Sequence, residues 1–322
     1  MKKLVLALAV LLAVSTAGCG TASSGKTSGS ASGSASKSTA AASSQTASSA
    51  AAFTGKYVTD ASYVKNHLSD IILVDARGEE TAAKGTVKGA IALTWQYLAT
   101  CEDGATGDAN WGCILDTARL SERLGEMGLS KDKEIVLFSS NQDGWGEDGR
   151  IAWELLAAGY TKVKIVDGGY PALKAAGIET QNGASKPTPT TVSVSSVDMT
   201  HDINTDELKD NYDQYKVVDV RSDKEYDGDT AYGEAKGGHL PGAIHIRYTD
   251  LFNTDGTLKS NAELTKLFTD AGLSKNDKIV TYCTAGIRSA YMQLVMEMCG
   301  FENVKNYDES YYRWCAVQEV EK

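Results

Sequence analysis

The chain reads GLSKDKEIV at residues 128–136 and GLSKNDKIV at residues 272–280, and this repetition decides the fold. The sequence VDAR at 74–77 returns as VDVR at 218–221, and both pairs lie 144 residues apart. Two separate matches at one offset indicate a duplicated unit. We therefore expect two copies of one domain, at residues 53–180 and 197–322, joined by a polar linker at 181–196.

Within each copy, short runs rich in β-branched residues alternate with segments of helical periodicity. Strands are predicted at 71–74, 134–138 and 163–166 in the first copy, and at 216–220, 278–282 and 304–306 in the second. Helices are predicted at 120–127, 150–158 and 289–298. This alternation is typical of an α/β fold, so we expect each copy to be a small parallel sheet with helices on both faces.

The composition limits the classes of partner that the chain can bind. The 322 residues include 42 Asp and Glu against 32 Lys and Arg, which gives a net charge of −10. Such an acidic chain without a basic stripe binds a phosphate backbone poorly, so we expect no nucleic-acid partner. No apolar run reaches the roughly 18 residues that a membrane-spanning helix needs, so no such helix is expected.

The N-terminus has the pattern of an export signal. Lys2 and Lys3 precede the apolar run 4–14, and small residues then lead to Cys19. The segment resembles a bacterial lipoprotein signal, which implies removal of residues 1–18 and acylation of Cys19; an ordinary secretory signal cleaved nearby is the alternative. Residues 19–52 are rich in Ser, Ala and Gly and are expected to form a flexible tether. Both interpretations place the protein outside the cytoplasm, and a lipid on Cys19 would anchor it to the membrane.

One loop of the second copy carries residues suited to nucleophilic chemistry. The predicted strand at 278–282 runs directly into Cys283, Thr284, Ala285, Gly286, Ile287 and Arg288. Ligands bind at such strand-to-helix junctions, where backbone N–H groups and the helix dipole favour a thiolate. Gly286 would let the loop close tightly, and Arg288 would add a cation for an anionic substrate. We predict Cys283 as the nucleophile and residues 284–288 as the substrate-binding loop; an inert buried cysteine is the alternative.

Together with VDVR at 218–221 and GGHLPGA at 237–243, this loop resembles the rhodanese family of sulfurtransferases in its tandem two-domain form. The resemblance runs from about Val58 to Trp314. It implies that Cys283 takes a sulfur atom from a small anionic donor such as thiosulfate and becomes a persulfide. A thiol or cyanide then removes that sulfur, and no cofactor takes part. 3-Mercaptopyruvate stays open as the donor, with Lys236 or Arg247 as cations for its carboxylate.

Four further residues of the second copy match the family pattern and are interpreted as scaffold: Asp219, Arg221, Glu225 and His239. Arg221 and Glu225 are spaced to pair across one helical turn. For Arg288 two roles stay open, a contact with the oxygens of the donor and a salt bridge with a carboxylate outside the loop.

The first copy lacks the nucleophile. The repeat places Ser139 at the position of Cys283, in a loop three residues longer, and backbone amides alone do not activate a serine hydroxyl. We expect this copy to be inactive and to help form the cleft, as the resemblance implies. Its G-x-G-x-x-G sequence at 144–149 has the outward pattern of a dinucleotide site. Glu147 and Asp148 would repel a pyrophosphate there, so no nucleotide is expected.

The remaining cysteines are Cys101, Cys113, Cys299 and Cys315. A disulfide between Cys101 and Cys113 would bracket a polar insert, and it stays open. Cys299 is expected in the core, and Cys315 could pair with it or resolve the persulfide. No cysteine or histidine has the spacing of a zinc site, so no metal is expected.

Two other functions stay open beside an enzyme of this kind. A sulfane-sulfur carrier or binding lipoprotein would load Cys283 without turnover. A phosphatase would share the fold and a Cys-to-Arg loop, although the loop of the related dual-specificity phosphatases is longer by one residue.

Overall fold

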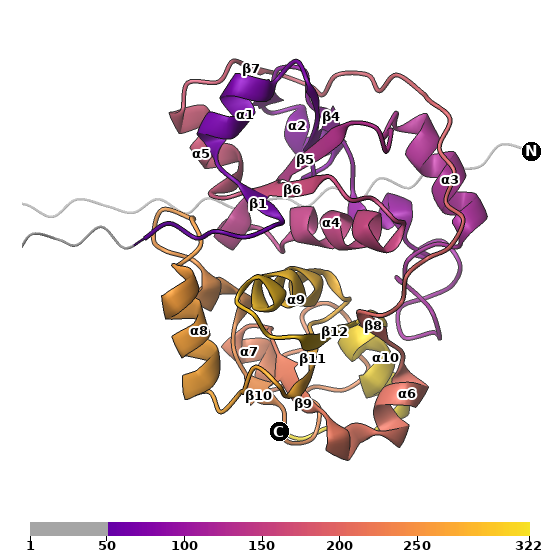
Figure 1. Cartoon of the computed structure of the whole chain (residues 1–322). Coiled ribbons are helices and arrows are strands. Elements are labelled where there is room, and N and C mark those ends of the chain that lie inside the picture. The colour runs from indigo at the N-terminus through magenta and orange to yellow at the C-terminus, as the bar shows by residue number, and fades with distance from the viewer. Residues whose placement is uncertain (1–50) are drawn as a thin grey trace, which may run out of the picture. The chain divides into compact units, whose positions relative to one another are not determined.

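The computed structural model describes residues 51–322. The predicted signal peptide at 1–18, Cys19 and the tether as far as residue 50 lie outside the described residues. The described part contains two parallel sheets of five strands, one in each half of the sequence (Figure 1).

The first half forms the sheet β1-β6-β5-β2-β4 and a separate antiparallel pair. Its strands are β1 (Val58–Thr59), β2 (Ile71–Asp75), β4 (Ile91–Ala92), β5 (Glu134–Phe138) and β6 (Val163–Val166), and the pair is β3 (Thr86–Val87) with β7 (Thr180–Gln181). Its helices are α1 (Ala61–His67), α2 (Glu79–Ala82), α3 (Thr117–Glu126), α4 (Glu147–Ala157) and α5 (Gly169–Ala175), with 3-10 turns η1 (Trp95–Leu98) and η2 (Asn141–Asp143).

The second half forms the sheet β10-β9-β11-β12-β8. Its strands are β8 (Asp202–Ile203), β9 (Lys216–Asp219), β10 (Ile244–His245), β11 (Lys278–Tyr282) and β12 (Asn303–Tyr307). Its helices are α6 (Thr205–Asp210), α7 (Asp223–Tyr226), α8 (Asn261–Asp270), α9 (Ile287–Met298) and α10 (Ser310–Val317), with 3-10 turns η3 (Tyr212–Gln214) and η4 (Tyr248–Leu251).

The two sheets have the same topology. β2, β5 and β6 take the places that β9, β11 and β12 take in the second sheet, and each sheet places its first strand, β1 or β8, at one edge. Val136 of β5 and Val280 of β11, which the repeat matches, are both fully buried. The predicted duplicated α/β fold is confirmed, and the predicted strands and helices agree with the structure to within three residues at each end.

Helices α4 and α9 pack against each other where the two halves meet (Figure 1). The glycines of the G-x-G-x-x-G sequence make this contact close. A Cβ atom on Gly149 would lie 2.3 Å from Cδ2 of Tyr291, and one on Gly146 would lie 3.1 Å from both Tyr291 and Tyr248. The sequence therefore serves the packing of the two halves, because a side chain at Gly149 would collide with the Tyr291 ring.

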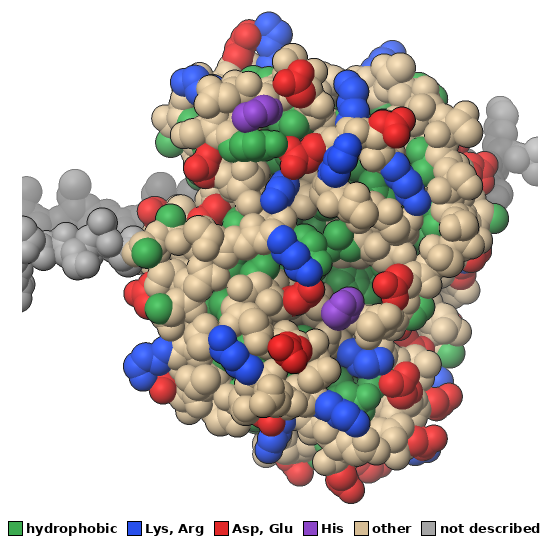
Figure 2. Space-filling model, in the orientation of Figure 1, with side chains coloured by type: hydrophobic (Ala, Val, Ile, Leu, Met, Phe, Trp, Pro, Cys, Tyr) green, Lys and Arg blue, Asp and Glu red, His purple; other side chains and the backbone are tan. Residues whose placement is uncertain are grey.

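The surface carries charges of both signs. On the face shown in Figure 2, Lys and Arg side chains are interspersed with Asp and Glu, as is usual for a solvated surface. Within residues 51–322, no helix combines the length and the apolar character needed to cross a membrane. The same residues bring no group of three or more His, Cys, Asp or Glu side chains together as a metal site.

Candidate active site

Cys283 follows the central strand β11, in the connection 283–286 that leads to α9. The residue is 1% exposed. Gly286 is the N-cap residue of α9 and has a φ of 78°, and a Cβ atom there would lie 2.7 Å from the carbonyl oxygen of Asp308. Both the backbone angle and this close approach require glycine, which is why the loop can close so tightly over the strand end.

The start of α10 fixes the backbone of Cys283. The Ser310 Oγ accepts from the Cys283 N–H and donates to the Cys283 carbonyl oxygen, both at 2.9 Å. The Tyr311 N–H donates to the same carbonyl at 3.1 Å. Ser310 has a φ of 56°, a conformation that costs a residue other than glycine on the order of 1–3 kcal/mol. Sequence analysis missed this clamp, because nothing marks a serine 27 positions away as a partner of the loop.

The surroundings of Cys283 favour the thiolate. Burial by itself would raise the pKa of the thiol. The positive charge of Arg288, the N–H groups of Ser289 and Ala285 and the Ser289 hydroxyl outweigh burial and lower that pKa below its ordinary value. The Ser289 Oγ donates to the Cys283 Sγ across 3.7 Å. The loop therefore shifts the equilibrium toward the thiolate, in the direction that sequence analysis expected from a position at a helix N-terminus.

Arg288 is bound by a carboxylate outside the loop. Its two Nη atoms donate to the Glu225 carboxylate at 2.8 and 2.7 Å, and Nη2 also donates to the Thr284 hydroxyl at 2.9 Å. Burial opposes ionisation of Glu225, but the hydrogen bonds and charge of Arg288 outweigh it and bring the pKa of Glu225 down to about 2. Of the two roles open for Arg288, the structure shows the salt bridge. Its charge still acts on Cys283, while three of its N–H donors are engaged by Glu225 and Thr284.

The predicted pairing of Arg221 with Glu225 is wrong. The Arg221 Nη2 donates instead to the Asp219 carboxylate at 2.7 Å. Ser222 is the N-cap residue of α7, so Arg221 precedes the helix and the spacing rule for residues on one helix face does not apply to it.

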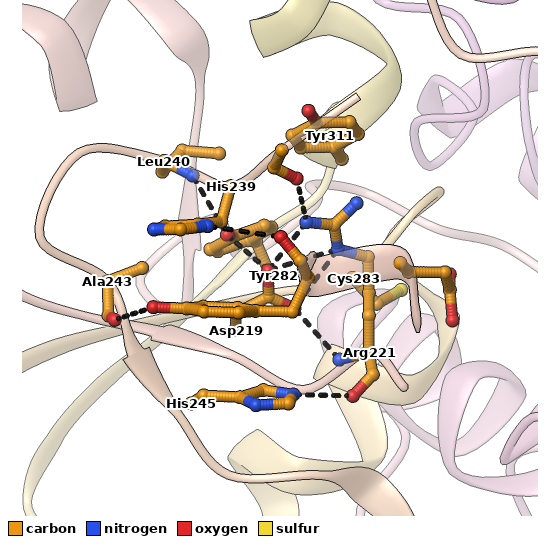
Figure 3. A network of polar contacts seen from close by, with 12 residues as sticks. Asp219, Arg221, His239, Leu240, Ala243, His245, Tyr282, Cys283 and Tyr311 are labelled. Atoms are coloured by element: carbon orange, nitrogen blue, oxygen red, sulfur yellow. Dashed lines mark hydrogen bonds and ion pairs between the residues drawn. The ribbon is translucent and has the colours of Figure 1, made fainter. Parts of the chain in front are cut away.

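A buried polar network surrounds this ion pair (Figure 3). Asp219 accepts a hydrogen bond from the Tyr282 hydroxyl, and the Arg221 guanidinium lies 3.8 Å from the centroid of the Tyr311 ring. His239 stacks on the Tyr226 ring, with 3.8 Å between the ring centroids. Asp219 ends β9 and Tyr282 ends β11, so the network joins the end of β9 to the end of β11, after which the Cys283 loop begins.

Cys283 lines a pocket whose walls come from both halves of the chain. The pocket has a volume of about 120 Å³. Its lining residues are Cys283, Thr284, Ala285, Ile287, Arg288, Trp95, Trp111, Trp145, Tyr232 and Tyr312. The predicted loop thus reaches the pocket except for Gly286, and Asp219, Glu225 and His239 stay outside it. The three tryptophans belong to the first half, and sequence analysis missed all of them.

Comparison with known proteins identifies the family. A family model described as "Rhodanese-like domain" matches residues 60–176 and 204–317. The chain belongs to the rhodanese family. A relative from Mycobacterium leprae, named "Putative thiosulfate sulfurtransferase", is 29% identical over 274 residues, which cover 82% of this chain and 96% of the relative. A relative of the same name from Haloferax volcanii is 27% identical over 80% of this chain and 92% of its own length. These comparisons support sulfurtransferase activity in general terms.

Solved structures share the tandem fold. Wild-type EanB superposes with a TM-score of 0.73 at 19% identity, over 83% of this chain and 69% of that one. An anaerobic ergothioneine biosynthesis enzyme from Chlorobium limicola gives a TM-score of 0.71 at 20% identity, over 80% and 68% of the two chains. At such identities the likeness shows the fold alone.

The first rhodanese domain has the opposite charge at the corresponding place. Ser139 follows β5 as Cys283 follows β11, but eight residues instead of four lead to the helix. Aligning the ends of α4 and α9 places Glu147 at the position of Arg288. Burial and the charge of Glu147 raise the pKa of the neighbouring Asp148 to about 7. This loop therefore lacks both the thiol and the cation that would stabilise a thiolate.

Arg150 of the first rhodanese domain contacts the active loop of the second. Its buried guanidinium donates to the Gly286 carbonyl oxygen at 3.3 Å and pairs with Asp308. It also donates to Glu154 on its own helix at 2.8 Å. The first domain thus helps to place the loop. Sequence analysis missed Arg150, because the contact spans 136 positions and leaves no local signal.

Within residues 51–322, the cysteines outside the pocket, Cys101, Cys113, Cys299 and Cys315, are free thiols. The Cys101–Cys113 disulfide that sequence analysis left open is not formed, and backbone hydrogen bonds close the insert instead, with the Thr100 N–H donating to the Cys113 carbonyl at 2.8 Å. Cys299 and Cys315 lie in two different core clusters, so they do not pair.

The two cations considered for a donor carboxylate do not line the Cys283 pocket. Lys236 donates to the carbonyl oxygen of Gln318 at 2.8 Å. Arg247 lines a neighbouring hollow and is paired there with Asp250 and Asp223, at 2.7 and 2.9 Å. Neither is free to meet a carboxylate beside the thiol.

Proposed function

We propose that the protein is a sulfurtransferase that carries sulfane sulfur as a persulfide on Cys283. The observation that carries the proposal is a thiol of lowered pKa, held in a six-residue loop at the wall of a small pocket. A thiolate is both a good nucleophile and a good leaving group, which a two-step transfer requires. The rhodanese family match over both halves supports the same chemistry.

In the first step, the Cys283 thiolate attacks the outer sulfur atom of thiosulfate. A new S–S bond forms, the S–S bond of the donor breaks, and sulfite leaves with the electron pair. The persulfide keeps one negative charge, so the N–H groups of Ser289 and Ala285 stabilise it as they stabilise the thiolate. The attack does not depend on a general base, because the lowered pKa of Cys283 favours the thiolate.

In the second step, the acceptor attacks the terminal sulfur atom and Cys283 leaves as a thiolate. A thiol acceptor becomes a persulfide, and cyanide becomes thiocyanate. Because Cys283 is only 1% exposed, the acceptor must enter the pocket to reach the sulfur. The aromatic walls therefore select the acceptor.

The test is thiocyanate formation from thiosulfate and cyanide by the purified protein. We expect turnover in the wild type, none in Cys283→Ser, and unchanged turnover in Cys101→Ser as the matched control, since Cys101 lies outside the pocket lining. Sulfur loading without turnover would favour the carrier function. Turnover by Cys283→Ser, or hydrolysis of p-nitrophenyl phosphate in place of sulfur transfer, would overturn the proposal.

We further propose that the protein is exported and anchored by a lipid on Cys19. The support is the sequence pattern of residues 1–19 alone. Fractionation of cells that are fed labelled palmitate tests it. We expect label and membrane association for the wild type and loss of label for Cys19→Ser. An unlabelled, secreted wild-type protein would indicate an ordinary signal peptide.

A further inference from the structure

Five aromatic rings wall the pocket beside Cys283, and two pairs of them join the domains. The Trp111 and Tyr312 centroids are 5.6 Å apart and the Trp145 and Tyr232 centroids 5.5 Å apart, both pairs edge to face. Trp145 is 49% exposed, so its ring is open to an incoming ligand. The Trp111 Nε1 donates to a backbone carbonyl at 3.1 Å and the Tyr312 hydroxyl to another at 2.8 Å. Because these polar atoms are already bonded, a ligand in the pocket meets the ring carbons, and the faces of the rings are electron-rich.

Three charged groups bear on the second-domain wall of the pocket: Arg288, Cys283 and Glu234. Arg288 is the cation among the lining residues, and the Glu225 carboxylate neutralises it at 2.7 and 2.8 Å. Cys283 adds a negative charge as a thiolate or persulfide. Glu234 adds a carboxylate that accepts from the Tyr232 N–H at 3.0 Å through Oε2.

The Glu234 carboxylate is incompletely satisfied. The residue is 7% exposed, and within residues 51–322 its Oε1 atom has no hydrogen-bond partner. Burial, followed by the charges of Glu234 and Cys283, raises the pKa of Tyr312 to about 12, so both charges act on this wall of the pocket. Glu234 does not line the pocket, so its carboxylate acts as a negative charge behind the wall that Tyr232 and Tyr312 form, and this charge favours a cation held against their rings.

We propose that the acceptor is a small organic thiol that carries a positively charged ammonium group, and that the ring walls bind this group. The proposal rests on the proposed function, since it concerns the second step at the same site. A cation is attracted by the ring faces and by Glu234, and it lies near the negative persulfide. A dianionic ligand meets the opposite field, because Arg288 is already bound to Glu225. We accordingly expect thiosulfate to bind weakly as a donor.

The step is balanced without an oxidant. The thiolate of the aminothiol attacks the terminal sulfur of the Cys283 persulfide and forms a new S–S bond. The S–S bond to Cys283 breaks, and its electron pair stays on Cys283 as the thiolate. The product is the persulfide of the aminothiol, and its ammonium group takes no part in the bond changes.

Binding is tested first without any sulfur transfer. Choline and its neutral isostere 3,3-dimethylbutan-1-ol are titrated separately into the sulfur-free protein. Tryptophan fluorescence reports the binding of each probe. We expect choline to bind about tenfold tighter. Glu234→Gln should reduce the ratio of the two affinities. The control Glu319→Gln, which removes an exposed carboxylate outside the pocket lining, should leave this ratio unchanged. Equal binding of the two probes, or tighter binding of the alcohol, would overturn the proposal.

Acceptor kinetics test the same preference during turnover. The acceptors are thiocholine, the isosteric 3,3-dimethylbutane-1-thiol and 2-mercaptoethanesulfonate, with kcat/KM expressed per ionised thiol. We expect thiocholine to be the best acceptor by about tenfold, Trp145→Leu to remove this advantage and Trp145→Phe to keep part of it. If the persulfide forms and all three thiols react equally, the aminothiol proposal fails alone. If no persulfide forms at Cys283, the proposed function fails.

Discussion

The loops that follow β5 and β11 are anchored by the same backbone contacts, which we call the frame, and differ in the side chains that they carry. In the first domain the carbonyl oxygen of Ser139 accepts from the Tyr170 N–H at 2.9 Å, and in the second that of Cys283 accepts from the Tyr311 N–H at 3.1 Å. Each domain thus ties the start of its loop to the helix after the next strand.

Both domains also share an arginine two residues after the neighbouring strand of the sheet, which is β2 in the first domain and β9 in the second. Arg77 lies 4.0 Å from the Tyr170 ring centroid and donates to the Gly85 carbonyl at 3.0 Å. Arg221 lies 3.8 Å from the Tyr311 centroid and donates to a glycine carbonyl at 2.7 Å. Since both domains keep this frame, the frame alone does not make a sulfur site.

The difference lies in the charge at the start of the helix. The second domain has the guanidinium of Arg288 beside its thiol, whereas the first has Glu147 and the buried Asp148 beside Ser139. The second-domain loop favours a thiolate at the residue after the strand, and the first-domain loop disfavours one. The comparison teaches that the scaffold positions a residue, and that a few charges near the helix N-terminus decide whether it can react.

The first test of this comparison concerns the contact between the domains. Arg150→Met would leave the buried carboxylates of Asp308 and Glu154 without their partner, so we expect a loss of about 3–5 kcal/mol in the free energy of unfolding. Urea unfolding measures it, with Arg119→Met as the control, because that exposed arginine should cost about 1 kcal/mol or less. Similar losses in both variants would show that Arg150 does not hold the domains together.

A second test concerns the loop of the first domain, where burial penalises the negative charge of Asp148. Asp148 has an ordinary pKa of 3.8 when unfolded and about 7 when buried. Between these values the native state holds a proton that the unfolded state has released, so the free energy of unfolding falls as the pH rises through this window and stays lowered above pH 7. We expect Asp148→Asn to be more stable at pH 8 by roughly 2–4 kcal/mol, with no gain below pH 4.

Urea unfolding at three pH values checks this expectation. The matched control is Asp70→Asn, which changes an exposed aspartate of the same domain and should give no comparable gain in stability at pH 8. A gain for Asp148→Asn that is the same at every pH would mean that the carboxyl is not the source of the penalty.

The third test removes the cation from the active loop. In Arg288→Gln we expect the pKa of Cys283 to rise, because the nearby positive charge is lost, so that activity at pH 7 falls about tenfold and recovers at alkaline pH. The double variant Glu225→Gln/Arg288→Gln avoids an unpaired buried carboxylate and should show the same alkaline shift. An unshifted pH–rate profile would assign the low pKa to the backbone amides alone.

The smallest effect is expected from giving the first domain a thiol. Ser139→Cys in the Cys283→Ser background should restore no sulfur transfer, since Glu147 and Asp148 oppose a thiolate there. The pH dependence of iodoacetamide labelling reports the pKa of the new thiol. Restored turnover would show that the nucleophile was all that the first domain lacked.

Sequence alone was sufficient for the features that local patterns encode. The repeat revealed two copies, and the strand-to-helix junction with Gly286 pointed to Cys283 as the candidate nucleophile, which the structure places at the pocket. Both inferences depend on neighbours in the chain, which a single sequence displays. The Arg221–Glu225 pairing failed for a local reason, because Ser222 begins α7 one residue after Arg221.

The features that sequence could not reveal are made by contacts across the fold. Arg150 lies 136 positions from Gly286, and Ser310 lies 27 positions from Cys283. The tryptophans of the pocket come from the first domain, which packs against the second through α4 and α9, where Gly149 leaves room for the Tyr291 ring. Such contacts are set by tertiary packing within the second domain and between the two domains, for which the sequence carries no local signal.

The central claim is that sulfur is held on Cys283 and on no other residue. We would incubate the protein with thiosulfate without an acceptor and map the added mass by peptide mass spectrometry. We expect one added sulfur, about 32 Da, on the peptide that contains Cys283. Sulfur on Cys101, Cys113, Cys299 or Cys315 instead, or the same addition in Cys283→Ser, would contradict the claim.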